Sequence, residues 1–88
     1  MENARPVIFH RKDCSKCKRA LYYLQTRSVA HDAVEVQEGT DSLEQLKKAT
    51  QQSSTPAFVF EEDHIHDFDV AELALFLRKH HLDPAAPR

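Results

Sequence analysis

Apolar residues recur along the chain in two patterns, one typical of strands and the other typical of helices. Short apolar runs or alternations predict strands at residues 6–10, 32–37, 57–61 and 64–66. Apolar positions spaced by three or four residues predict helices over residues 14–28, 41–52 and 70–81. The predicted order of elements is therefore β-α-β-α-β-β-α.

Candidate capping residues stand before two of the predicted helices. Asp69 lies three residues before a glutamate, which is the spacing of a capping box. Asp41 and Ser42 each lie three residues before a Glu or a Gln, so either could start a capping box at the second helix. We expect that helix to bury Ala49, and we expect Tyr22 in the first helix to be at least half-buried.

The order of the elements predicts their topology. A strand–helix–strand opening implies a right-handed crossover and parallel pairing of the first two strands. The last two strands are joined by a tight turn and form an antiparallel hairpin, while the helices cover both faces of the sheet. We therefore expect an α/β, thioredoxin-like fold, a four-stranded mixed sheet flanked by three helices. We expect it to be one domain over residues 1–88, with a frayed tail at 82–88.

The composition fits a small soluble domain. The chain has 88 residues, of which 41% are apolar and 30% charged, and its formal net charge is −2. This charge gives no reason to expect a nucleic acid or a membrane as a partner, and no apolar stretch approaches the ~20 residues of a membrane span. Residues 1–10 do not resemble a signal peptide, so we expect the protein in the reducing cytoplasm. We also expect it to be a monomer.

Two cysteines, Cys14 and Cys17, form a C-x-x-C motif where the first helix begins. A disulfide across so short a loop restrains the unfolded chain little, which leaves redox chemistry or metal binding as the reason for the pair. Unpaired N–H groups, the helix dipole and basic neighbours such as Lys16 stabilise a thiolate on Cys14. Cys17 lies one helical turn further along the same face, within reach of a disulfide that Cys14 forms.

Two alternatives to redox chemistry stay open. Cys14 and Cys17 could join His64 and His66 in a zinc site, although the H-x-H spacing and the distance from the cysteines differ from those of zinc fingers. The chain could also be a redox-inactive binding or adaptor module, or a carrier of zinc or an Fe–S cluster. Redox chemistry is favoured, because a C-x-x-C motif that follows a strand and opens a helix is typical of thiol–disulfide exchange. We expect no resident metal.

With these features the chain resembles the glutaredoxin family, including its thioredoxin-reductase-dependent, NrdH-like branch. The resemblance covers nearly the whole chain. It rests on the order of the strands and on two motifs, Cys14-Ser15-Lys16-Cys17 at the family's C-x-x-C and Ser54-Thr55-Pro56 at its T-V-P. The absence of Trp argues against thioredoxin itself, whose motif is W-C-G-P-C.

The resemblance implies a thiol–disulfide oxidoreductase that reduces protein disulfides or glutathione mixed disulfides. Cys14 would be the nucleophile and Cys17 the resolving thiol. Pro56 falls where the family has a cis proline facing the two sulfurs, and the backbone beside it would pair with an extended substrate. No cofactor would be bound. Glutathione would serve as a co-substrate, and electrons would come from glutathione or from thioredoxin reductase.

The resemblance also implies residues that bind glutathione. Arg11 falls where many members have a Lys that contacts the glycyl carboxylate, and Lys16 adds positive charge that attracts an anion. Thr55 would offer its backbone to the cysteinyl part, and Asp69 matches one Asp of the G-G-x-D-D segment that holds the γ-glutamyl end. The chain departs from the family where C-P-Y-C is replaced by C-S-K-C, and where a histidine and an aspartate replace the two glycines.

Overall fold

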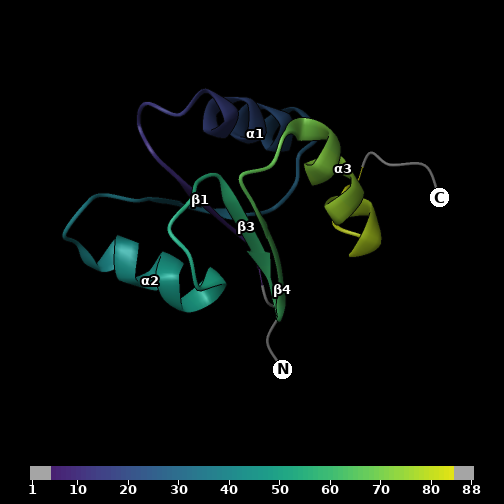
Figure 1. The fold of residues 1–88 in the computed structure, drawn as a ribbon. Helices are drawn as coiled ribbons and strands as arrows, with labels where there is room; N and C mark the ends of the chain where they lie inside the picture. Colours follow the sequence, from purple (N-terminus) through teal and green to yellow (C-terminus); the bar gives the residue numbers. More distant parts are fainter. Residues whose placement is uncertain (1–4, 85–88) are drawn as a thin grey trace.

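The computed structural model describes residues 5–84 and contains the order of elements that the sequence predicts (Figure 1). Each strand has four residues, and the helices have ten to twelve. In chain order the elements are β1 (Val7–His10), α1 (Ser15–Thr26), β2 (Asp32–Glu35), α2 (Asp41–Thr50), β3 (Ala57–Phe60), β4 (Asp63–His66) and α3 (Val70–Lys79).

The four strands form one mixed sheet in the order β2-β1-β3-β4. β1 pairs in parallel with β2, with Phe9 beside Val34, and antiparallel with β3, with Phe9 beside Ala57. β4 returns antiparallel to β3. In Figure 1, α1 and α3 lie together on one side of the sheet and α2 lies on the other. The thioredoxin-like α/β fold is therefore confirmed, including the parallel opening strands and the closing hairpin.

Apolar side chains fill both faces of the sheet. The larger cluster lies between the sheet and helices α1 and α3, and within it Phe58 and Phe76 pack edge to face with ring centroids 5.5 Å apart. The smaller cluster lies between the sheet and α2 and includes Leu46. Successive strand residues point to opposite faces, so Ile8 joins the larger cluster and Phe9 the smaller one. Packing on both faces thus fixes β1, the strand that leads to Cys14.

The two predicted helix caps have different outcomes. α3 begins with a capping box, as predicted. The side chain of Asp69 accepts the N–H of the next residue at 3.0 Å, and Glu72 accepts the N–H of Asp69 at 2.9 Å. The capping box predicted for α2 is absent, because the N-cap is Thr40 and both Asp41 and Ser42 lie inside the helix.

Two predictions about burial are also wrong. Tyr22 is 70% exposed, because α1 turns the side that carries Cys17 and Leu24 toward the core and Tyr22 lies on the opposite side. Ala49 is exposed, whereas its neighbour Thr50 is buried. The Thr50 hydroxyl donates to a backbone carbonyl of its own helix at 2.9 Å, so its burial leaves no polar group unpaired.

The first residues of the predicted tail contact the rest of the fold. Leu82 packs against the larger cluster, and its N–H donates to the carbonyl of Leu77 at 2.8 Å. Asp83 pairs with Arg27 of the loop that follows α1. The predicted tail from residue 85 onward lies outside the described residues.

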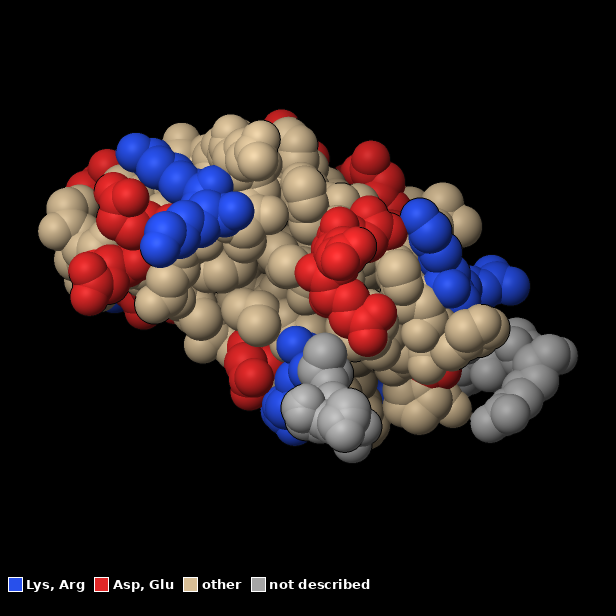
Figure 2. Space-filling model, turned by 90° about the horizontal axis from the view of Figure 1, so that it is seen from below, with Lys and Arg blue, Asp and Glu red and all other residues tan. Residues whose placement is uncertain are grey.

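Charged side chains of both signs lie on the surface. On the face seen from below in Figure 2, basic and acidic side chains form several small separate groups. Among the helices described between residues 5 and 84, none is both long enough and apolar enough to cross a membrane.

Candidate active site

Cys14 occupies the start of α1. It is the N-cap residue of that helix, with an extended backbone (φ −116°, ψ 108°), and its Sγ accepts a hydrogen bond from the N–H of Cys17 at 3.0 Å. The bond satisfies one of the N–H groups that a helix N-terminus leaves unpaired, and the positive end of the helix dipole acts in the same direction. This position stabilises a thiolate on Cys14 when the protein is reduced.

The two cysteines differ in their access to solvent. They are joined by a disulfide, with Cα atoms 5.1 Å apart. Cys17 is fully buried, whereas Cys14 is half-buried and lines a pocket. Helical periodicity accounts for this difference, because Cys17 is on the side of α1 that faces the core and Cys14 precedes the first turn. The arrangement therefore leaves one accessible sulfur with a second sulfur directly behind it.

Basic side chains surround the start of α1, and the first turn of the helix contains no acidic residue. Lys12 and Lys18 are exposed, and Asp13, in the turn that precedes the helix, is an exposed acidic neighbour. Lys16 is half-buried, and its Nζ lies 3.2 Å from Oδ1 of Asp67, which follows β4. The charge of Lys16 is thus partly neutralised, whereas those of Lys12 and Lys18 are exposed to solvent.

Pro56 lies at the same edge of the sheet as Cys14. The pairing of Phe9 with Ala57 brings the start of β3 next to the end of β1, so the residue before β3 is close to the turn that carries the cysteines. Pro56 is buried, the Thr55–Pro56 peptide bond is cis as expected, and the Pro56 carbonyl accepts the N–H of Asp67 at 2.8 Å. Thr55 is half-buried and lines the pocket together with Cys14.

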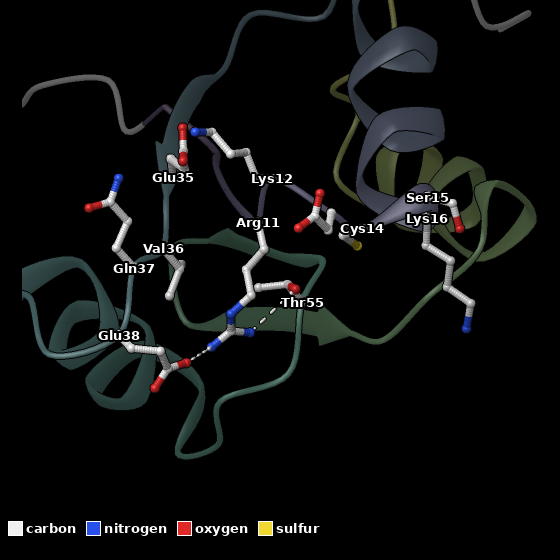
Figure 3. Close-up of a pocket in the computed structure, with 11 residues that line it drawn as sticks. Arg11, Lys12, Cys14, Ser15, Lys16, Glu35, Val36, Gln37, Glu38 and Thr55 are labelled. Carbon is white, nitrogen blue, oxygen red and sulfur yellow. Dashed lines mark hydrogen bonds and ion pairs between the residues drawn. The ribbon is translucent and has the colours of Figure 1, made fainter.

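Arg11 connects three segments at this edge of the sheet (Figure 3). Its Nη1 donates to the carbonyl of Ser53 at 2.8 Å and lies 3.4 Å from Oγ1 of Thr55. Its Nη2 forms an ion pair with Glu38 at 3.2 Å. The guanidinium thus joins the end of β1 to the loop before β3 and to the loop after β2.

A pocket of about 800 Å³ opens beside Cys14. In the view of Figure 3, the Cys14 sulfur lies between Arg11 and Thr55 on one side and Lys16 on the other. The pocket is lined by Arg11, Lys12, Asp13, Cys14, Ser15, Lys16, Glu35, Val36, Gln37, Glu38 and Thr55. Of the residues predicted to bind glutathione, three are therefore brought together around the accessible sulfur.

Asp69 lies apart from these three. It caps α3, and its Oδ1 lies 3.5 Å from a guanidinium nitrogen of Arg19 on α1. It does not line the pocket beside Cys14. Asp67, two residues before it, has a left-handed backbone (φ 49°), a conformation that glycine adopts without strain. Asp69, one of the predicted binding residues, therefore lies outside the pocket beside Cys14.

The last residue of β2 and the segment that follows it line the pocket, but the prediction missed them. Glu35, Val36, Gln37 and Glu38 belong to no motif, so nothing in their local sequence indicates a site. Topology is the signal that could have found them. Parallel strands β1 and β2 end at the same edge of the sheet, where open α/β sheets bind ligands.

The proposed zinc ligands are not assembled. His64 and His66 lie on β4, and neither lines the pocket next to the cysteines. Within residues 5–84, no three or more His, Cys, Asp or Glu side chains are arranged to hold a metal ion.

The chain is similar to known proteins in both sequence and structure. Residues 7–65 match the protein family described as Glutaredoxin. The crystal structure of a glutaredoxin from Archaeoglobus fulgidus is similar, with a TM-score of 0.73 and 21% identity, over 85% of this chain and 87% of that chain. Because the identity is low, this structural likeness shows a shared fold and nothing beyond it. No curated protein matches the chain.

Proposed function

The chain belongs to the glutaredoxin family, and we propose that it is a thiol–disulfide oxidoreductase that reduces protein disulfides and glutathione mixed disulfides. One observation carries the proposal. Of two bonded sulfurs, one lines a pocket at a helix N-terminus and the other is fully buried just behind it. This asymmetry supports a division of roles between an attacking thiol and a resolving thiol.

In the first step, the thiolate of Cys14 attacks one sulfur of the substrate disulfide. A bond forms between Sγ of Cys14 and that sulfur, the substrate S–S bond breaks, and the other substrate sulfur leaves as a thiolate and takes up a proton. The N–H of Cys17, 3.0 Å from Sγ of Cys14, supports this step because it holds negative charge on the attacking sulfur.

In the second step, the thiolate of Cys17 attacks Sγ of Cys14. The Cys14–Cys17 disulfide forms, which is the bond present in the structure, and the remaining substrate sulfur leaves as a thiolate. Over the cycle the substrate gains two electrons and two protons, and the protein dithiol loses them. We propose that glutathione or a thioredoxin reductase returns them to the protein.

We further propose that an extended segment of a protein substrate lies along Thr55 and Pro56, in the manner of an added strand. Thr55 lines the pocket with Cys14, and both residues directly precede β3. A substrate segment in this position would bring its disulfide to the accessible sulfur.

A mixed disulfide between a cysteine peptide and glutathione tests the proposed function. Its reduction is measured with glutathione and glutathione reductase, and separately with thioredoxin reductase, for the wild type, Cys14→Ser and Cys17→Ala. Gln45→Ala, an exposed change on α2, is the control and should keep wild-type activity.

We expect Cys14→Ser to fall to the uncatalysed rate, because the attacking sulfur is gone. Cys17→Ala should accumulate an adduct on Cys14 that mass spectrometry identifies as half of the substrate. Wild-type activity in Cys14→Ser would overturn the proposal, and so would a wild type that does not reduce this substrate with either reductant.

A further inference from the structure

The guanidinium of Arg11 already contacts three groups of the protein, so few of its N–H groups are left for a ligand. Its guanidinium contacts the carbonyl of Ser53, the hydroxyl of Thr55 and the carboxylate of Glu38. The Arg11 side chain is 29% exposed, whereas that of Glu38 is 80% exposed. Glu38 therefore neutralises part of the charge of a guanidinium that is already largely enclosed, and a negatively charged ligand would meet both groups.

The other residues of the pocket do not replace the positive charge that this ion pair neutralises. Its lining has three basic residues, Arg11, Lys12 and Lys16, and three acidic residues, Asp13, Glu35 and Glu38. Lys16 has its own ion pair with Asp67, outside the lining. The whole chain has a net charge of −2. Long-range attraction for an anion is therefore weak, and local contacts decide whether a carboxylate binds.

From these contacts we infer that Glu38 is a specificity-determining residue, which through Arg11 selects against disulfides that carry carboxylates, glutathione mixed disulfides among them. The inference rests on the proposed function. A carboxylate that approaches Arg11 must displace Glu38, which breaks an ion pair, or lie beside it, which brings like charges together, and both cost free energy. A protein disulfide that is neutral around its cysteine meets no such opposition. The pocket therefore favours protein disulfides over glutathionylated ones.

A matched pair of substrates isolates this effect. The first is a neutral cysteine peptide joined by a disulfide to glutathione, and the second is the same peptide joined to glutathione diethyl ester, in which both carboxylates are capped. The measured quantity is the ratio of kcat/KM for the first substrate to kcat/KM for the second. This ratio cancels any change in the redox chemistry that both substrates share.

Glu38→Gln should raise the ratio about two- to fivefold, the range that a single exposed ion pair reaches. In about 1 M NaCl, where the Debye length is roughly 3 Å, the increase should largely disappear. Glu62→Gln is the control, since it changes net charge equally. Glu62 lies in the turn between β3 and β4, at the end of the sheet away from Cys14.

A double-mutant cycle shows whether Glu38 acts through Arg11. If it does, Glu38→Gln should leave the ratio unchanged in an Arg11→Gln background, because no guanidinium remains to be released. Since Arg11 also holds the loop that contains Ser53, turnover of the diethyl ester substrate shows that Arg11→Gln is folded and active.

The outcomes separate the two proposals. A rise in the ratio for Glu38→Gln that requires Arg11 supports the inference. An unchanged ratio, an equal rise in Glu62→Gln, or a rise that persists without Arg11 overturns it, while the proposed function stands as long as the diethyl ester substrate is reduced. A wild type that reduces neither substrate overturns the proposed function and this inference with it.

Discussion

Replacing each cysteine of the C-x-x-C motif by serine should affect stability differently at the two positions. The comparison is made in the reduced protein, so that the disulfide contributes to neither variant. Cys14 is a half-buried N-cap whose side chain already accepts the N–H of Cys17. Serine is a preferred N-cap residue, so Cys14→Ser should leave the free energy of unfolding unchanged or raise it by up to about 1 kcal/mol.

The side chain of Cys17, in contrast, has no access to water. Its side chain is fully buried on the side of α1 that faces the core. A hydroxyl there loses its water, at a cost of about 1–3 kcal/mol where the new hydrogen bonds are poor. The two variants should therefore differ by about 2 kcal/mol in free energy of unfolding. For a domain of this size, that difference corresponds to roughly 8–16 °C in Tm.

Thermal unfolding followed by circular dichroism, with excess reductant, measures this difference. Cys17→Ala separates the loss of the sulfur from the burial of a hydroxyl, and it should unfold between Cys17→Ser and the wild type. Equal Tm values for Cys14→Ser and Cys17→Ser would refute the reasoning, because the two sites would then be equally accessible to water. The roles proposed for the two thiols would lose their structural basis.

Three further changes test the electrostatics, the cap and the core. Hydrogen bonds from His80 and Lys79 lower the pKa of Asp63 from 3.8 to about 2, so its contribution to stability is complete above pH 3.8 and is lost as the pH falls through 2. The difference in free energy of unfolding between the wild type and Asp63→Asn, from urea titrations, should thus be larger at about pH 5 than at about pH 2; an equal difference would contradict this. In thermal melts, Asp69→Ala should lower the free energy of unfolding by about 1 kcal/mol, because it removes the N-cap of α3. Asp69→Asn should lower it much less, because asparagine also caps helices, and equal losses would exclude the cap as the cause. Phe58→Ala should lower the free energy of unfolding by about 3–5 kcal/mol, because Phe58 is fully buried. A loss below about 1 kcal/mol would show that Phe58 does not belong to the core.

Local patterns were sufficient to predict the fold and the reactive pair. Strand β1 is a run of β-branched and aromatic residues, and α3 begins at a capping box, so each specifies its own conformation. The order of such elements then restricts the topology to very few arrangements. The position of Cys14 follows from the same local reasoning, because the end of a strand and the start of a helix define the turn between them.

The side of a helix that is buried is harder to predict than the helix itself. Ala49 and Thr50 are neighbours in α2, and burying either gives little free energy, since alanine is small and threonine carries a hydroxyl. Packing of the larger Leu46 against the sheet sets the rotation of the helix, and Thr50, one turn later, is buried as a consequence. In α1 the same effect leaves Tyr22 exposed. Rotations of this kind depend on contacts between distant segments, which local periodicity does not contain.

Glu38 shows why topology is needed to complete the site. It lies 27 residues from Arg11 in the chain, yet the two side chains form an ion pair. Because β1 and β2 are parallel and β3 is antiparallel to β1, the ends of the first two strands and the start of the third meet at one edge of the sheet. A thiol at the end of β1 therefore acquires neighbours from the other two segments, whatever their sequence. Motifs identify Cys14 and Pro56, but the charge that faces a substrate is determined by this meeting of three segments, and hence by residues that no motif marks.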